Sequence, residues 1–425
     1  MGIIVQKYGG SSVADVEKIG RVAARVAQTR AGGHPVVVVV SAMGDTTDEL
    51  HDLALDVSPL PPGRELDMLL TAGERISMAL VAMAIANLGF EARSFTGSQA
   101  GVITDSTHGK ARIIDVTPGR ISGALADGAI PIVAGFQGVS QDSKDITTLG
   151  RGGSDTTAVA LAAALGAPTC EIYTDVDGVF TADPRIVPAA RRIPAISYEE
   201  MLEMAAGGAK VLHLRCVEYA KHYQMAIHVR SSFSNREGTW VSDALAAQRE
   251  GNGMDQPIIT GVAHDRSEAT VTVSGIPDKV GVAAQLFRVV ARSGINIDMI
   301  VQSTSRSTGQ ADISFTLPRQ DGQIAMTALR GVQEEIGFDS LVFDDRIGKI
   351  SLIGAGMRSH PGVSADFFGA LADAGINIRM ISTSEIRISA VVDAADLDVA
   401  VIATHRAFGL EDGQSTAVAY GGTGR

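Results

Sequence analysis

Three short glycine-containing segments carry the side chains best suited to chemistry. The first, residues 7–12, reads Lys-Tyr-Gly-Gly-Ser-Ser and follows an apolar run. Its glycines allow backbone N–H groups to approach an anion, and a helix that begins there adds a favourable dipole. Lys7 adds a positive charge where an open α/β sheet binds its ligands. The segment indicates a phosphate-binding turn, while a plain strand-to-helix turn with an exposed lysine fits it equally well when it is taken alone.

The second segment, residues 150–157, reads Gly-Arg-Gly-Gly-Ser-Asp-Thr-Thr and precedes an alanine-rich helix expected at 158–165. Ser154 or Asp155 alone would suit an ordinary helix N-cap. Arg151 indicates more, because a guanidinium binds a carboxylate through two parallel hydrogen bonds and the flanking glycines leave space for one. This segment therefore predicts a carboxylate-binding loop.

The third segment, residues 207–210, reads Gly-Gly-Ala-Lys. Taken alone, Lys210 is more simply explained as a solvated lysine after a helix. The P-loop pattern, a strand-linked G-x-G-x-x-G and the protein-kinase signatures H-R-D and D-F-G do not occur in the sequence. The chemistry therefore has to come from a different phosphate-binding arrangement.

Apolar β-branched runs alternate with helical patterns over the first 230 residues. The expected strands are residues 3–7, 36–40, 130–134, 170–174 and 226–230. All but the last are nearly continuous apolar runs, as in strands that are covered on both faces. Ser197 and Glu200 form a capping box that begins a helix, and Gly207-Gly208 ends it. This alternation predicts an α/β three-layer domain with a mainly parallel sheet.

An internal repeat follows a polar stretch near residues 235–253. The segment Gly-Ile-Asn-Ile-Asp-Met-Ile at 294–300 recurs 81 residues later as Gly-Ile-Asn-Ile-Arg-Met-Ile, and Gly281-Val282 recurs as Gly362-Val363. Each copy has the element order of a ferredoxin-like βαββαβ unit, so the duplication predicts two such units in tandem. The expected domains are 1–235 for the α/β domain, 236–263 for a linker, 264–345 for the first repeat and 346–425 for the second.

Composition argues against several classes of protein. The net charge is -12, and the longest basic clusters are pairs such as Arg191-Arg192, so nucleic acid is not an expected partner. Cys170 and Cys216 are too few for a disulfide framework or a zinc site. No secretory signal is evident, and the most apolar helical segment, 76–88, is shorter than the roughly 18 residues of a membrane span. We expect a cytoplasmic protein that does not contact membranes.

Taken together and in this order, the segments resemble the aspartate kinases of the amino acid kinase family. The resemblance spans essentially the whole chain and ends in two repeats of the ACT type. It is carried by residues 7–14, 41–44, 71–74, 135–138, 151–155 and 173–185. It implies transfer of the ATP γ-phosphoryl group to the β-carboxylate of L-aspartate, which gives 4-phospho-L-aspartate. This is the first step of the lysine, threonine and methionine pathway.

The resemblance also implies the roles of single residues. Lys7, Asp155 and Lys210 would be catalytic, with the lysines neutralising phosphate oxygens and Asp155 orienting them. No general base is needed, because a carboxylate with a pKa of about 4 is already ionised. The other residues implied in ATP binding are Gly9, Gly10, Ser41, Tyr173, Thr174, Asp175, Val179, Phe180, Asp183 and Pro184. Mg²⁺ would bridge the ATP phosphates with few protein ligands, so we expect no dedicated metal site.

The resemblance also implies which residues bind aspartate. The residues implied are Thr47, Glu74, Arg151, Gly152, Gly153 and Ser154. The opposite charges of Arg151 and Glu74 independently match the carboxylate and the ammonium of a zwitterion. The nucleotide segment, residues 173–184, is also compatible with a strand followed by an ordinary Asp-Gly turn.

The ACT-type repeats resemble modules that bind amino acids between paired sheets, often across a subunit interface. The implied effector positions are Asp278, Gly281, Asn296, Ile297, Asp298 and Gln302 in the first copy, and Val363, Asn377, Ile378 and Glu385 in the second. Lysine, threonine or both are the expected feedback inhibitors, and homo- or hetero-oligomers are expected through these modules. The glycine turns could also only cap helices, and Met254 could begin a separate regulatory subunit.

Two other functions stay open. Another amino acid kinase, for glutamate or acetylglutamate, is disfavoured by the ACT repeats and by the segment 71–74. A non-catalytic amino-acid sensor is disfavoured because Lys7, Asp155 and Lys210 are all present. A fused homoserine dehydrogenase is not expected, since the sequence ends soon after the second repeat.

Overall fold

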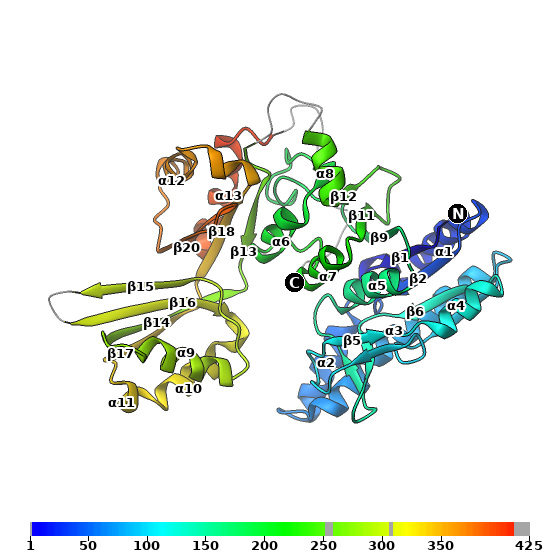
Figure 1. The fold of residues 1–425 in the computed structure, drawn as a ribbon, viewed down its shortest axis with the longest axis horizontal. Coiled ribbons are helices and arrows are strands. Elements are labelled where there is room, and N and C mark those ends of the chain that lie inside the picture. Colours follow the sequence, from blue (N-terminus) through cyan, green and yellow to red (C-terminus); the bar gives the residue numbers. More distant parts are fainter. Residues whose placement is uncertain (1, 251–257, 306–308, 412–425) are drawn as a thin grey trace.

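A mainly parallel eight-stranded sheet forms the centre of the N-terminal domain (Figure 1). The structure is a computed structural model that describes residues 2–250, 258–305 and 309–411. The strand order is β10-β12-β11-β9-β1-β2-β6-β3, and only β11 and β12 pair in antiparallel fashion. The bounds are β1 Ile4–Tyr8, β2 Val36–Val40, β3 Ala92–Phe95, β6 Ile130–Ala134, β9 Thr169–Thr174, β10 Ala195–Ile196, β11 Ala226–Ser231 and β12 Thr239–Val241.

Helices cover both faces of this sheet, so the predicted three-layer α/β domain is confirmed. The five valines of β2 show why, because all of them are fully buried. Val36, Val38 and Val40 pack on the side of α1 (Val16–Ala31) and α3 (Gly63–Ala86). Val37 and Val39 pack on the side of α5 (Gly153–Ala164) and α7 (Leu214–Tyr223). The remaining helices are α2 Thr46–Val57, α4 Gly119–Ala126, α6 Tyr198–Ala206 and α8 Asp243–Glu250.

Local sequence signals located five of the eight strands of the central sheet. The strands predicted at 36–40 and 130–134 have the expected bounds, those predicted at 170–174 and 226–230 are each one residue longer, and the one predicted at 3–7 is shifted by one residue. The capping box is present, since the Ser197 hydroxyl accepts a hydrogen bond from the Glu200 N–H at 3.2 Å. The helix expected at 158 begins at Gly153 instead, because the glycine-containing loop continues directly into its first turn.

α3 is longer than the sequence pattern indicated. The apolar segment expected at 76–88 belongs to a helix of 24 residues, Gly63–Ala86, which by length and composition alone could cross a membrane. Half of its most apolar window is buried inside the protein, against α1 and the sheet. This helix also carries the buried carboxylates of Asp67 and Glu74. It is therefore a core helix of the N-terminal domain.

A small second sheet lies beside α3 and was not predicted. It has the order β5-β4-β7-β8 and brings the loop between β4 and β5 next to the helix. Its strands are β4 Val102–Thr104, β5 Ile113–Val116, β7 Gln137–Ser140 and β8 Ile146–Thr148.

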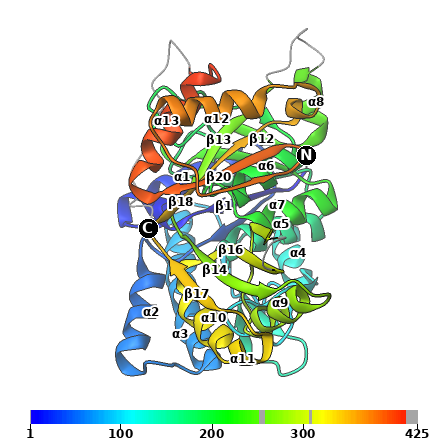
Figure 2. The ribbon, with the colours of Figure 1, turned by 90° about the vertical axis from the view of Figure 1, so that its left-hand side faces the viewer.

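Two four-stranded antiparallel sheets form the C-terminal half, as the duplication predicts. The first module contains β14 Glu268–Pro277, α9 Val282–Arg292, β15 Ile300–Ser305, β16 Gln310–Pro318, α10 Gly322–Arg330, α11 Gln333–Ile336 and β17 Ser340–Asp344. The second contains β18 Ile347–Ile353, α12 Val363–Asp373, β19 Met380–Thr383, β20 Arg387–Asp393 and α13 Leu397–Ala407. Figure 2 shows them at opposite ends of one face, with α12 and α13 at the top and α10 and α11 at the bottom.

The sheets divide the chain differently from the expected boundaries. Residues 236–263 are not a simple linker, because Thr239–Val241 forms β12 inside the N-terminal sheet. β13, Gly261–Asp265, pairs with β18 and takes the place in the second sheet that β17 has in the first. The first module is therefore inserted between two strands of the second. An 81-residue repeat locates equivalent helices, but it does not reveal which strand completes each sheet. Met254 and residues 412–425 lie outside the described residues.

Candidate active site

Lys7 and Asp155 meet at the carboxyl end of β1. The Lys7 Nζ lies 2.5 Å from Asp155 Oδ1, and each side chain is 11% exposed. Asp155 stands in the first turn of α5, whose N-terminus points its unpaired N–H groups and partial positive charge into the same region. A Cβ atom on Gly9 would lie 3.5 Å from the Lys7 ammonium. The ammonium is thus held over the glycine turn, where an anion would find both charge and backbone donors.

Gly10 allows a second loop to approach this turn. A Cβ atom there would lie 2.9 Å from the Gly44 carbonyl oxygen, and the Gly44 N–H donates to the Gly10 carbonyl at 3.1 Å. The Ser41 N–H donates to the Tyr8 carbonyl at 3.1 Å. These contacts place Ser41 beside Lys7, and both residues line the same cavity.

That cavity has a volume of about 1300 Å³ and collects the residues expected to bind aspartate. It opens between α3, the small sheet and the N-terminus of α5. The predicted residues that line it are Lys7, Ser41, Thr47, Glu74, Arg151, Gly152, Gly153, Ser154 and Asp155. Residues more than 140 positions apart in the sequence are therefore brought into one site.

Glu74 is a buried carboxylate with half of its acceptor capacity unused. The side chain is 2% exposed, and Oε1 accepts a hydrogen bond from the Ala42 N–H at 3.2 Å. Oε2 is buried and has no hydrogen-bond partner among the described residues. Burial raises the pKa of Glu74 to about 7, although the backbone N–H bonds act in the opposite direction. A cationic group in the cavity would satisfy this oxygen and favour its ionised form.

Arg151 supplies the opposite charge. It is exposed on the glycine loop, and we find no ion pair of its guanidinium within the part of the chain that is described. The neighbouring glycine has a packing role, because Gly152 has φ +68 and a Cβ atom there would lie 2.1 Å from the His213 ring. The glycines therefore let the loop pack against α7, as well as leaving Arg151 accessible.

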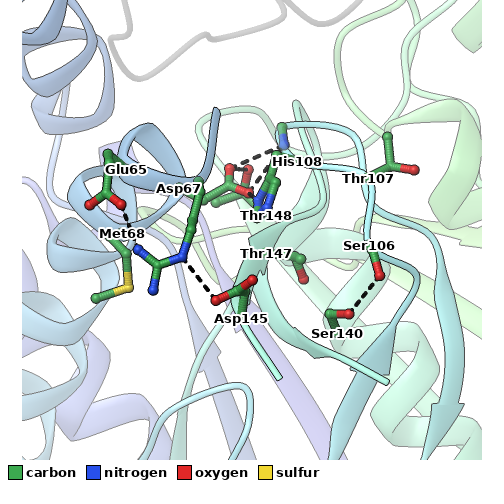
Figure 3. A network of polar contacts seen from close by, with 12 residues as sticks. Glu65, Asp67, Met68, Ser106, Thr107, His108, Ser140, Asp145, Thr147 and Thr148 are labelled. Carbon is green, nitrogen blue, oxygen red and sulfur yellow. Dashed lines mark hydrogen bonds and ion pairs between the residues drawn. The ribbon is translucent and has the colours of Figure 1, made fainter. Parts of the chain in front are cut away.

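A polar network around Asp67 was missed by the sequence analysis (Figure 3). Asp67 is 1% exposed, and its carboxylate contacts His108 Nδ1 at 2.7 Å and accepts a hydrogen bond from Thr148 Oγ1 at 2.5 Å. The Gly109 N–H adds a bond at 3.1 Å. These bonds fix the β4–β5 loop to α3 at the wall of the cavity. The sequence contains little sign of this network, because Asp67 stands close to the charged residues Arg64 and Glu65 in the same helix.

His213 is a second residue that the sequence analysis did not single out. It precedes α7, lines the same cavity and has a buried Nδ1 without a partner among the described residues. Burial lowers the pKa of His213, so the ring is neutral at pH 7.

A smaller cavity of about 590 Å³ collects most of the predicted nucleotide residues. These are Thr174, Asp175, Val179, Phe180, Asp183, Pro184 and Lys210. Lys210 lines this cavity whereas Lys7 lines the larger one, so the structure places the two predicted catalytic lysines in separate cavities. The cavities approach each other along the strand ends, since Lys7 pairs with Ile172 and the Gly9 N–H donates to the Tyr173 carbonyl at 3.3 Å.

Gly9, Gly10 and Tyr173 are not among the residues that line either cavity. Tyr173 is 1% exposed and stacks on Tyr8 with ring centroids 4.7 Å apart. Burial raises the pKa of Tyr173 to about 12. Its ring belongs to the core and only its backbone reaches the glycine turn, so the predicted role of Tyr173 in ATP binding stays a prediction.

The predicted effector residues do not gather in one place. Gly281 and Gly362 begin α9 and α12 in the left-handed conformation, with φ 94 and 107. Asn296 lines the larger cavity of the N-terminal domain, and Asp298 lies 2.7 Å from the Lys349 ammonium. Of the others, Val363 is buried, Ile297 and Ile378 pack partly into the module cores, Glu385 pairs with Arg358, and Asp278, Gln302 and Asn377 are exposed.

Comparison with known proteins agrees with this architecture. A model of the amino acid kinase family matches residues 2–231, and an ACT domain model matches residues 270–332 and 350–408. An aspartokinase from Mycolicibacterium smegmatis is 65% identical over the whole of both chains. The chain belongs to the aspartokinases of the amino acid kinase family. The resemblance, the fold class and the assignment as a phosphotransferase are thereby confirmed.

Two solved structures extend the comparison. E. coli aspartokinase III in complex with aspartate and ADP, described as the R-state, matches 95% of this chain and 99% of its own, with a TM-score of 0.81 and 26% identity. The same enzyme in complex with lysine and aspartate, described as the T-state, matches with a TM-score of 0.70 and 27% identity. This aspartokinase is therefore closer in shape to the aspartate- and ADP-bound neighbour.

Proposed function

We propose that this aspartokinase transfers the γ-phosphoryl group of ATP to the β-carboxylate of L-aspartate and releases 4-phospho-L-aspartate. The observation that carries the proposal is the buried Oε2 of Glu74, which has no hydrogen-bond partner in the described part of the chain and lies in the same cavity as Arg151 and the Lys7–Asp155 pair. Glu74 would accept the substrate ammonium, and Arg151 would bind its α-carboxylate. The β-carboxylate would then be directed towards Lys7. Thr47, Gly152, Gly153 and Ser154 line the same cavity and complete the proposed aspartate site.

The nucleotide is proposed to bind in the smaller cavity with its phosphates towards Gly9 and Gly10. Lys210 would neutralise phosphate charge from that side, and Lys7 would do so from the aspartate side. Because the attacking carboxylate is already ionised, positioning and charge neutralisation carry the reaction. Asp155 keeps the Lys7 ammonium at the strand end, where the migrating phosphoryl group would arrive.

The residues present fit a Mg²⁺–nucleotide complex rather than a preformed metal cage. Among the described residues there is no group of three or more His, Cys, Asp and Glu side chains that could hold a metal ion. Asp175 lines the nucleotide cavity, whereas Asp183 is already engaged by Arg185 at 2.8 Å. Asp175 is thus the carboxylate best placed to meet phosphate-bound Mg²⁺, which would supply charge neutralisation.

Regulation is proposed to reach the enzyme through its ACT modules. The E. coli neighbour solved with lysine supports an amino-acid effector, and lysine, threonine or both together are our candidates. We also propose assembly into homo- or hetero-oligomers through these modules, a cytoplasmic location consistent with ATP as substrate, and a place at the head of lysine, threonine and methionine synthesis. An effector acts only if it binds one global state better than the other.

An ADP-release assay with trapping of the acyl phosphate by hydroxylamine tests the reaction. Aspartate, glutamate and N-acetylglutamate are compared as acceptors, each with and without lysine plus threonine. We expect turnover and hydroxamate only with aspartate, and lower turnover when the effectors are present. Faster turnover with glutamate or N-acetylglutamate would refute the acceptor, and unchanged turnover and affinity with both effectors would refute the proposed regulation.

A further inference from the structure

The second ACT module forms one wall of the smaller cavity. His264 and Arg266 from the end of β13 and the turn after it, and Asp398 from α13, line it together with the nucleotide segment of the N-terminal domain. No sequence pattern associated these three residues with the nucleotide. The regulatory half of the chain therefore faces the same space as Lys210.

This wall is attached to the nucleotide segment by direct contacts. The Val262 N–H donates to the Thr181 carbonyl at 2.7 Å, and the Thr181 hydroxyl lies 2.8 Å from His405 Nε2 in α13. Val176 and Phe180 also share one apolar core with the second module, including Phe367. Because these contacts are buried, β13 and α13 keep their positions relative to the nucleotide segment.

The Gly207-Gly208 turn, which leads to Lys210, rests on the same strand. A Cβ atom on Gly207 would lie 2.9 Å from the Ala263 Cβ, and one on Gly208 would lie 2.1 Å from the His264 carbonyl oxygen. The glycine pair thus permits contact between the end of α6 and β13. Lys210 and Arg266 consequently line one cavity.

The cations in this cavity differ in how firmly they are engaged. The Arg185 guanidinium donates to both carboxylate oxygens of Asp183, at distances from 2.8 to 3.2 Å. Arg266 pairs with Asp398, and both side chains are about half exposed. An exposed ion pair contributes little to stability, so a nucleotide phosphate with several negative charges can compete for this guanidinium.

Resting on the proposed location of the nucleotide, we propose that Arg266 is a nucleotide-binding residue supplied by the ACT half of the chain. In the absence of nucleotide its guanidinium is paired with Asp398. When ATP binds, the Arg266 guanidinium donates hydrogen bonds to phosphate oxygens in the cavity that Lys210 also lines. The nucleotide site of this aspartokinase is then completed by its regulatory region.

Steady-state kinetics of Arg266→Ala and Asp398→Asn in the full-length enzyme test this role. Arg266→Ala is expected to raise the KM for ATP about tenfold, the effect of losing one charge-assisted hydrogen bond, while the aspartate KM stays within twofold. Asp398→Asn is expected to lower the ATP KM about two- to threefold, because it releases the guanidinium. Arg319→Ala, which breaks the exposed Arg319–Asp345 pair in the first module, is the matched control.

The two variants separate binding from a structural role because their expected effects have opposite signs. If the Arg266–Asp398 pair only supports the fold, both substitutions raise the ATP KM alike and lower the melting temperature alike. That result, or an unchanged ATP KM in Arg266→Ala, would overturn the proposal. Lys210→Ala tests whether the nucleotide binds in this cavity. If Lys210→Ala raises the ATP KM and Arg266→Ala does not, only the role of Arg266 is rejected. If neither variant changes the ATP KM, the proposed location of the nucleotide is rejected.

Discussion

At the scale of single residues, Glu74 and Arg151 are charged groups of opposite sign in the larger cavity, and neither has an ion-pair partner within the described chain. Their environments differ, because Glu74 is buried and Arg151 is exposed. Burying a carboxylate without a partner costs free energy, so we expect this carboxylate to bind a cationic group of the ligand. Because the pKa of Glu74 is raised to about 7, the effect of its ionisation on ligand binding can be measured near neutral pH.

Aspartate affinity is expected to rise with pH through the pKa of Glu74. The ammonium binds the carboxylate form, so binding must release the proton that Glu74 holds below about pH 7. The Kd for aspartate is expected to fall about tenfold between pH 6 and pH 8. Isothermal titration calorimetry in two buffers with different ionisation enthalpies measures both the Kd and the released proton.

Glu74→Gln provides the control for this prediction. The variant should bind aspartate weakly, with a Kd that does not follow this titration. The raised pKa also means that the stability contributed by Glu74 is complete below its ordinary pKa of about 4.3 and is lost as the pH rises through about 7. Equal proton release by wild type and Glu74→Gln would contradict the assignment.

Arg151 and Lys7 should affect different kinetic constants. Arg151→Ala is expected to raise the aspartate KM about a hundredfold and the ATP KM by less than threefold, since a bidentate carboxylate contact is lost. Lys7→Ala is expected to lower kcat by about three orders of magnitude with the fold intact. Initial rates over a grid of both substrates, with circular dichroism of each variant, provide the measurement. Equal rises in both KM values for Arg151→Ala, or a wild-type kcat for Lys7→Ala, would refute these roles.

At the scale of elements, glycine turns determine how helices and strands approach each other around the site. Gly152 allows the Arg151 loop to pack on His213, and Gly208 allows the end of α6 to pack on β13. Both have positive φ, which L-residues with a side chain adopt at a cost. A helical glycine without such contacts, Gly20 in α1, offers the contrast.

Gly208→Ala should therefore disturb the nucleotide site through the position of the turn before Lys210. We expect it to lower the melting temperature and to raise the ATP KM, because the added methyl group would overlap the His264 carbonyl. Gly20→Ala should stabilise the protein by about 0.5–1 kcal/mol and leave both KM values unchanged. Differential scanning fluorimetry and ATP titrations compare the two. A Gly208→Ala enzyme as stable as wild type would show that the turn relaxes freely.

At the scale of the whole molecule, a charge cluster joins the kinase domain to both ACT modules. Lys349 in β18 is completely buried, with Asp298 of the first module 2.7 Å away and Glu268 in direct contact. It also donates to the Ala206 carbonyl at the end of α6, at 3.2 Å. Arg387 extends the cluster to Glu203 of α6 at 3.1 Å. Burial acts to lower the pKa of Lys349, but the two carboxylates outweigh it, and the pKa is raised.

Lys349→Met should destabilise the protein far more than the loss of a surface ion pair. Removing the lysine leaves Glu268 and Asp298 without their shared cation, a loss of about 3–5 kcal/mol for a buried pair. Arg319→Ala is the control, with an expected loss below about 1 kcal/mol. Urea denaturation followed by circular dichroism compares them at pH 7. Similar midpoints for the two variants would mean that the cluster is not a structural junction.

Patterns along the chain were enough to locate the elements whose signals are local. The five valines of β2 indicated a strand buried on both faces, Ser197 with Glu200 began α6, and the 81-residue repeat revealed the two modules. The ordered series of short motifs indicated the family. Each of these depends on hydrophobic patterning, capping or the recurrence and order of short segments along the chain, which can be recognised without knowing the partners in space.

Which distant segments meet became known only from the folded chain. The fold pairs β13 with β18, places the Tyr173 ring in the core, separates Lys7 from Lys210 into two cavities and joins Asp67 to His108. Residues that are remote in sequence make these contacts, and each is selected by the packing of whole layers against one another. Which strands and side chains pair depends on the burial and the partners available to all of them at once. The pattern of residues within a short segment does not contain that information.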